Sequence, residues 1–243
     1  MIGNSNFYGF IFLLSYYIMA AGIISLFDYL TDYSREWIRK SYHIMYSFSL
    51  LIIIYIFSDW YIAVLVLLGI SLAAVLILNL SVKLFPGLKQ LSISRKSSIK
   101  EVLRQMIYLH STFSLLILIF QYLGQQYIFH VVVGVMIWGF GDSAAALVGK
   151  FIGKREYNNI IFPSGKTLEG SLGFIGVSFF PAFIVLLFLG GYHVVQAMIT
   201  AAVLVVLASL VEALSRKGID TITIPLFAAL FSVLLEKLYL YLI

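Results

Sequence analysis

One carboxylate of this chain lies inside an apolar stretch, where a charge is costly. Asp142 falls within the apolar run 127–149, and a carboxylate at such depth costs several kcal/mol unless it is paired or bound to a metal. Small residues leave one flank of the predicted helix almost free of side chains: Gly139, Gly141, Ala144, Ala145, Ala146, Gly149 and Gly153. This pattern suits two structures. One is close helix packing with Asp142 as a hydrogen-bond partner. The other is a pocket where an anion and its metal approach the backbone.

Further polar residues follow Asp142 at short spacing. Three lysines supply positive charge: Lys150, Lys154 and Lys166. Glu169 adds a second carboxylate at the start of the next apolar run, among small and hydroxyl residues: Thr167, Gly170 and Ser171. Carboxylates, lysines and accessible glycine backbone are together the groups that Mg²⁺-nucleotide chemistry uses.

Three other groups of ionisable residues are predicted to lie on the same face of the membrane. Glu36, Arg39, Lys40 and His43 fall on about one side of a helix that begins the second apolar run. Glu212 lies near the end of the seventh run, and Asp220 precedes the eighth. The alternatives are headgroup anchoring for the basic residues and a surface charge or helix cap for Glu212 and Asp220. The remaining histidines have no metal-site spacing and are predicted to be interfacial: His110, His130 and His193.

These residues must be positioned by helices that cross a membrane. The 243 residues are 62% hydrophobic and 11% charged, whereas soluble domains carry about 25% charged residues. The apolar segments are about as long as a bilayer requires: 7–27, 43–58, 60–80, 106–123, 127–149, 168–190, 193–213 and 222–242. We therefore predict an all-α, polytopic transmembrane bundle of about eight spans in one domain, residues 1–243. Seven spans is the alternative, because the second run is short and Asp59-Trp60 could be a kink.

The basic residues predict the orientation of these spans. Every Lys and Arg except Lys237 falls in or beside the first, third, fifth or seventh loop. Cytoplasmic loops carry the excess of Lys and Arg, so we expect these loops in the cytoplasm and both termini on the other side. The net charge of +5 then reflects membrane anchoring and gives no reason to expect nucleic acid. With no cysteine, the chain has no disulfide and no thiolate metal site.

Taken together, these motifs resemble the membrane-embedded lipid-alcohol kinases, the family of dolichol kinase, phytol kinase and CTP-dependent diacylglycerol kinase. The resemblance extends from about Glu36 to Pro225 and is most specific from Gly141-Asp142 to Ser171. One position departs from the family pattern, which commonly has Asn after the late Asp where this chain has Thr221. The related phosphatidate cytidylyltransferases end on a Pro-Gly-His-Gly-Gly stretch, and this chain lacks it.

The resemblance implies transfer of the γ-phosphoryl group of CTP, with Mg²⁺, to a membrane lipid hydroxyl on the cytoplasmic face. It implies catalytic roles for Asp142, Lys166 and Glu169, and Mg²⁺ ligands among Asp142, Glu212 and Asp220. Glu169 would position Lys166 or accept the substrate proton. It also implies nucleotide or phosphate binding by a larger set: Gly141, Gly149, Lys150, Gly153, Lys154, Thr167, Gly170, Ser171, Arg39, Lys40 and His43.

Two other functions stay open, cytidylyl transfer and ion-coupled transport. A transporter would normally show an inverted repeat with paired sites at mid-membrane, and no repeat is visible in the sequence. The membrane would be the plasma membrane of a prokaryote, or the endoplasmic reticulum or plastid membrane of a eukaryote. The expected partners are a nucleoside triphosphate, a lipid alcohol and membrane lipids, and self-association is left open. The identity of the lipid alcohol does not follow from the residues.

Overall fold

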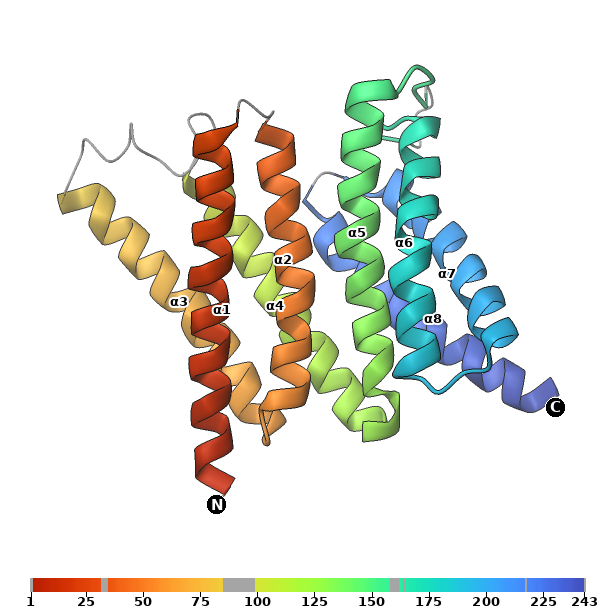
Figure 1. Ribbon diagram of the computed structural model, residues 1–243, viewed down its shortest axis with the longest axis horizontal. Coiled ribbons are helices and arrows are strands. Elements are labelled where there is room, and N and C mark those ends of the chain that lie inside the picture. Colours follow the sequence, from red (N-terminus) through yellow and green to blue (C-terminus); the bar gives the residue numbers. More distant parts are fainter. Residues whose placement is uncertain are drawn as a thin grey trace.

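Eight long α-helices make up almost all of the computed structural model (Figure 1). It describes residues 2–31, 35–84, 99–157, 162–163, 165–216 and 218–242, and none of these forms a β-strand. The helices, with one 3₁₀ turn, are α1 (Ile2–Leu30), α2 (Arg35–Ile56), α3 (Trp60–Leu84), α4 (Ile99–Leu123), η2 (Gln125–Tyr127), α5 (Ile128–Ile152), α6 (Leu168–Phe188), α7 (Val194–Leu214) and α8 (Asp220–Leu242). The prediction of an all-helical chain is confirmed for this part of the sequence.

Helices α2 and α3 are separated at Asp59-Trp60. This is the position at which the sequence alone did not distinguish seven spans from eight. The side-chain amide of Asn6 donates to Asp59 Oδ2 at 2.7 Å, and its carbonyl accepts from the amides of Ser58 and Asp59 at 3.0 and 3.2 Å. These bonds satisfy backbone groups at the break, so Asp59-Trp60 marks a turn between two separate helices.

Seven of the eight described helices are long and apolar enough to cross a membrane, and α2 is the exception. Its first turns carry Glu36, Arg39, Lys40 and His43, which lower its hydropathy. Large apolar side chains are exposed along α1, α3 and α7, for example Ile18, Leu76 and Ile199. Exposure on this scale fits contact with lipid, and the protein is an integral membrane protein. Whether α2 spans the membrane, and which face each terminus occupies, stay predictions.

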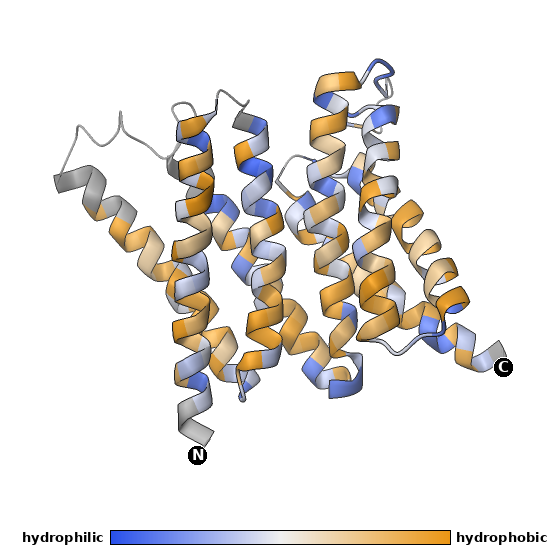
Figure 2. Ribbon diagram, in the orientation of Figure 1, coloured by the Kyte–Doolittle hydropathy of each residue, from blue (hydrophilic) through white to orange (hydrophobic). Residues whose placement is uncertain are grey.

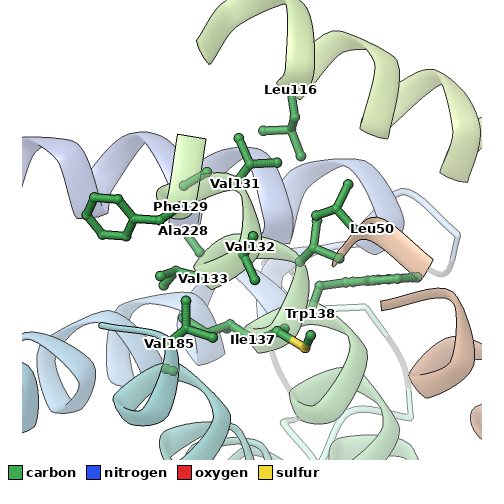
Figure 3. Packing of buried hydrophobic residues seen from close by; sticks show 14 of the residues in the cluster. Leu50, Leu116, Phe129, Val131, Val132, Val133, Ile137, Trp138, Val185 and Ala228 are labelled. Carbon is green, nitrogen blue, oxygen red and sulfur yellow. The ribbon is translucent and has the colours of Figure 1, made fainter. Parts of the chain in front are cut away.

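Helix α5 is the centre of the bundle. It packs against α2, α4, α6, α7 and α8, and its first half is buried on all sides, as expected of a helix that is apolar all round. Figure 3 shows Val131, Val132, Val133, Ile137 and Trp138 of α5 within this core. Neighbouring helices contribute Leu50, Leu116, Val185 and Ala228. Polar side chains in the buried part of α5, Asp142 among them, therefore lie in a water-poor environment.

Polar residues gather towards the ends of the helices, while their middles are hydrophobic (Figure 2). The two chain termini lie towards one end of the bundle (Figure 1). The start of α2, the end of α5 and the start of α6 lie at the other end, which we call the loop end (Figure 1). The candidate functional residues belong to elements that meet on this side of the molecule.

Candidate functional site

The buried carboxylate of Asp142 pairs with two side chains of α2. Lys40 Nζ donates to Asp142 Oδ2 at 2.5 Å, and His43 Nδ1 lies 3.0 Å from the same oxygen. Lys40 is 2% exposed and Asp142 4% exposed. Two residues at positions i and i+3 of a helix share one face, so α2 presents both to α5. The cation that we expected Asp142 to require is thus supplied, at least in part, by the protein itself.

The approach of α2 to α5 at this point depends on a glycine. A Cβ atom on Gly139 would lie 1.6 Å from Ser47 Oγ, so no larger residue fits there without movement. Ser143 Oγ donates to the carbonyl of Gly139 at 2.5 Å and of Lys40 at 3.3 Å. His43 stacks on the Trp138 ring with centroids 5.0 Å apart. These contacts fix the geometry of the buried ion pair.

A second part of the site lies where α5 passes into α6. Thr167 caps α6, and its hydroxyl accepts from the amide of Gly170 at 3.0 Å. Glu169 Oε2 accepts from the amides of Lys154 and Arg155 at 3.1 and 3.2 Å. Glu169 therefore holds the backbone after α5 and does not pair with Lys166, the partner that we had considered for it.

The glycines of α5 and α6 allow these helices to pack closely. A Cβ on Gly141 would lie 2.6 Å from the Phe174 ring, and one on Gly153 would lie 2.9 Å from Thr167. The corresponding atoms on Gly149 and Gly170 would both lie 3.0 Å from Thr167 Oγ1. This is the packing alternative that the small-residue flank left open, and phosphate binding by these residues stays a prediction.

A third part of the site comes from α7 and α8. Lys166 Nζ donates to Glu212 Oε1, and Glu212 is 4% exposed. Asp220 begins α8, where its Oδ1 accepts from the amides of Gly218 and Thr221 at 3.1 and 2.9 Å. Asp220 is thus the first residue of α8 and binds backbone amides next to it, whereas the capping alternative would need a bond to an amide two or three residues further along the helix. Thr221 makes this contact through its backbone amide and not through the side chain that replaces the family Asn.

These three parts form one cluster of charges. The Asp142, Glu212 and Asp220 carboxylates are close enough for their charges to interact, and Arg39, Lys40 and Lys166 lie within the same range. We call these six residues the ionic cluster. They come from α2, α5, α7, α8 and the segment before α6, as the sequence predicted for the face that they share.

The other predicted residues, and Arg39 in addition, make contacts outside this cluster. Arg39 pairs with Glu36 in α2, and Lys150 is near enough for its charge to act on Glu36. Lys154 is exposed at the loop end. Ser171 Oγ accepts from Tyr157 Oη at 3.1 Å, a contact that sequence reasoning missed. Sequence reasoning also missed Ser47. Only the i+4 spacing of Ser47 from His43, whose carbonyl accepts from the Ser47 hydroxyl, could have indicated the role of Ser47.

The histidines outside the ionic cluster correct one prediction. His193 is exposed at the start of α7, as an interfacial residue would be, but His110 and His130 are buried. His130 lies within hydrogen-bond distance of Ser232 Oγ, at 2.6 Å, and Glu236 Oε2, at 2.8 Å. Ser232 and Glu236 are about 100 residues from His130 in the sequence, so sequence reasoning could not identify them as its partners.

Carboxylate oxygens are the ligands that Mg²⁺ prefers, and the ionic cluster contains three carboxylates. Among the described residues, however, no group of three or more His, Cys, Asp or Glu side chains is arranged to hold a metal ion. The carboxylate ligands fit a metal ion. In this structure, however, two of the three carboxylates are paired with lysines. A metal role for Asp142, Glu212 and Asp220 stays a prediction.

The chain is similar to a curated protein, the phytol kinase of Synechocystis sp. (strain ATCC 27184 / PCC 6803 / Kazusa). The two are 34% identical over 100 residues, which is 41% of this chain and 42% of the relative. The match thus spans less than half the length of that protein. No family model matches the chain, and no solved structure matches it.

Proposed function

We propose that this protein is a lipid-alcohol kinase that transfers the γ-phosphoryl group of CTP to a hydroxyl of a membrane lipid. The observation that carries the proposal is the ionic cluster, in which Asp142 and Lys40 are buried beside Lys166, Glu212 and Asp220. Similarity to a phytol kinase supports the same chemistry. Phosphoryl transfer depends mainly on positioning and charge neutralisation, and this cluster provides both.

Each part of the site has a role in this proposal. Lys166, with Lys150 and Lys154 at the loop end, would bind the phosphates of the nucleotide. Asp142, Glu212 and Asp220 would hold Mg²⁺, which when bound neutralises charge on the phosphates. Displacement of Lys40 or Lys166 from its carboxylate would free that carboxylate for the ion. Glu169 would keep the Lys154 and Arg155 backbone in place, so we now give it a positioning role.

The reaction needs no covalent intermediate with the protein. The lipid hydroxyl oxygen forms a bond to the γ-phosphorus, and the bond from that phosphorus to the bridging oxygen breaks. The nucleoside diphosphate leaves, and the hydroxyl proton passes to a carboxylate of the ionic cluster. The lipid tail stays in the hydrocarbon region throughout, so that only the hydroxyl must reach the cluster.

Two labelled nucleotides test the proposal with purified protein. With γ-³²P-CTP, Mg²⁺ and a series of prenyl alcohols and diacylglycerol, the label should pass to the lipid fraction. With α-³²P-CTP it should stay in water. Transfer of the α-label alone would identify a cytidylyltransferase, and transfer of neither would overturn the proposal. Competition by unlabelled ATP measures the preference for CTP.

The proposed orientation has its own test, which the lack of cysteines makes simple. A cysteine at Gln125 should react with an impermeant maleimide added outside intact cells. A cysteine at Glu156, which is exposed at the loop end, should react only after the membrane is opened. Labelling of both from outside would exclude a cytoplasmic site.

A further inference from the structure

An apolar groove of about 870 Å³ runs between α2, α5 and α6. Its walls include Phe48 and Tyr55 of α2, Phe140 of α5, and Ile184 and Phe188 of α6. The volume lies within the range of roughly 300–1,000 Å³ that is usual for ligand sites. Every side chain in its lining is apolar or aromatic, so it suits a hydrocarbon and offers nothing to a charged ligand.

The groove and the ionic cluster share two helices, α2 and α5. Phe140 precedes Asp142 by two residues, and Phe48 follows Ser47, whose hydroxyl donates to the His43 carbonyl at 3.0 Å. The Phe48 and Phe140 rings meet edge to face with centroids 5.8 Å apart. Phe48 lies five residues after His43, or about 8 Å along α2, so a molecule in the groove would have its nearer end within about two helical turns of the buried ion pair.

The groove also has the position and depth of a lipid chain. From Phe48 it continues along α2 to Ile56, which is about 12 Å at 1.5 Å per residue. Half of a hydrocarbon core is about 15 Å. Phe188 is 74% exposed and Ile184 51% exposed, and apolar side chains exposed to this extent at the groove suit contact with hydrocarbon better than contact with water.

We infer that this groove binds the hydrocarbon tail of the acceptor alcohol and makes the enzyme selective for chain length. The inference rests on the proposed function. A kinase acting on a lipid alcohol must hold the hydroxyl at its charges while the tail stays in an apolar environment. The groove is apolar along its length and shares α2 and α5 with the ionic cluster, so it suits both needs. Acceptors too short to enter it lose the burial of their tail, and with it affinity.

A pair of matched variants tests the inference. Ile184→Trp fills the groove, while Ile199→Trp places the same side chain on the lipid face of α7, outside the groove, where Ile199 is 61% exposed. We expect Ile184→Trp to raise KM for a 20-carbon prenyl alcohol by about tenfold or more, equivalent to about 1.4 kcal/mol of binding. KM for a 10-carbon prenyl alcohol and for CTP should not change. Equal KM values in both variants and the native protein would overturn the inference.

A binding measurement separates this inference from the proposed function. Native protein is irradiated with a diazirine analogue of a 20-carbon prenyl alcohol, and the labelled peptides are mapped. Label should fall on residues 48–56 and 180–189, and excess unlabelled prenyl alcohol should displace it while phosphatidylcholine should not. Equal displacement by phosphatidylcholine, or cross-links that join two copies through these residues, would overturn the inference. Specific labelling without phosphoryl transfer would retain the groove and reject the kinase.

Discussion

Helix α5 carries two buried polar sites that differ in kind. Near its middle, Asp142 belongs to the ionic cluster, where charges from several elements meet. Twelve residues earlier, or about 18 Å along the helix, His130 lies between Ser232 and Glu236 of α8. Both histidine ring nitrogens have partners, and one helix pair supplies all three side chains.

The difference shows which feature indicates function. Burial of polar groups is common to both sites, and buried polar groups in proteins are normally hydrogen-bonded. The His130 site is complete with three residues, whereas the ionic cluster concentrates three carboxylates and three basic side chains from five elements. Charge in excess of what helix packing needs therefore favours the ionic cluster as the functional site that we propose, and a structural role for the His130 site.

Among the variants that test this comparison, Asp142→Asn should have the largest effect on catalysis. Loss of a carboxylate that meets the reacting phosphates should lower kcat by about three orders of magnitude. The variant also leaves Lys40 buried without a counter-charge, which costs about 3–5 kcal/mol of folding free energy. Because of the ion pair, we therefore expect a neutral residue at 142 to lower the stability of the protein. Turnover and detergent melting temperature measure the two effects.

A double variant separates the chemical from the structural role of Asp142. Lys40→Met combined with Asp142→Asn removes both members of the pair, so the melting temperature should recover most of its loss. Turnover should stay low, because the site still lacks its carboxylate. Recovery of turnover together with stability would show that Asp142 only packs helices.

The next effect concerns the contact between α2 and α5. Gly139→Ala places a methyl group 1.6 Å from Ser47 Oγ and forces these helices apart. Overpacking costs about 1–3 kcal/mol, and the shift of Lys40 from Asp142 should also lower kcat. Gly176→Ala is the matched control, since a Cβ there meets nothing within 4 Å. Equal kcat values in the two variants would contradict the proposed dependence on this contact.

A smaller effect is expected when Lys166 is removed. Lys166→Ala should raise the nucleotide KM by about tenfold and lower kcat, because the ammonium group touches phosphates in the ground and transition states. Lys237→Ala, near the other end of the bundle, removes an exposed lysine that lies over the Tyr127 ring. It should leave both constants unchanged. If the two variants have the same KM for CTP, Lys166 does not bind the nucleotide.

The smallest effect on catalysis should come from His130. His130→Ala removes the link between α5 and α8 and should lower the free energy of unfolding by about 1–3 kcal/mol. Because this site lies far from the ionic cluster, kcat should be almost unchanged at a temperature where the variant is folded. A large loss of kcat without a change in melting temperature would reverse the comparison.

The helices and the identity of the polar segments could be read from the sequence alone. Lipid requires every backbone polar group to be satisfied within its own helix, so each crossing segment needs about 20 apolar residues. That constraint is local, and it explains why the predicted runs agree with α1 to α8. Asp142 was recognisable for the same reason, because a charge within such a run is an exception that one window of sequence reveals.

The partners of these residues were decided only by the tertiary structure. Lys40 and Asp142 are separated by 102 positions, as are His130 and Ser232, and hydropathy says nothing about which helix faces which. The structure also gave Glu169 two backbone amides in place of Lys166, and packed the glycines against Phe174 and Thr167. The sequence specified which residues carry charge, and the packing of α5 among its neighbours decided which of those charges meet. Helix packing depends on side-chain shape across long separations, which no local pattern encodes.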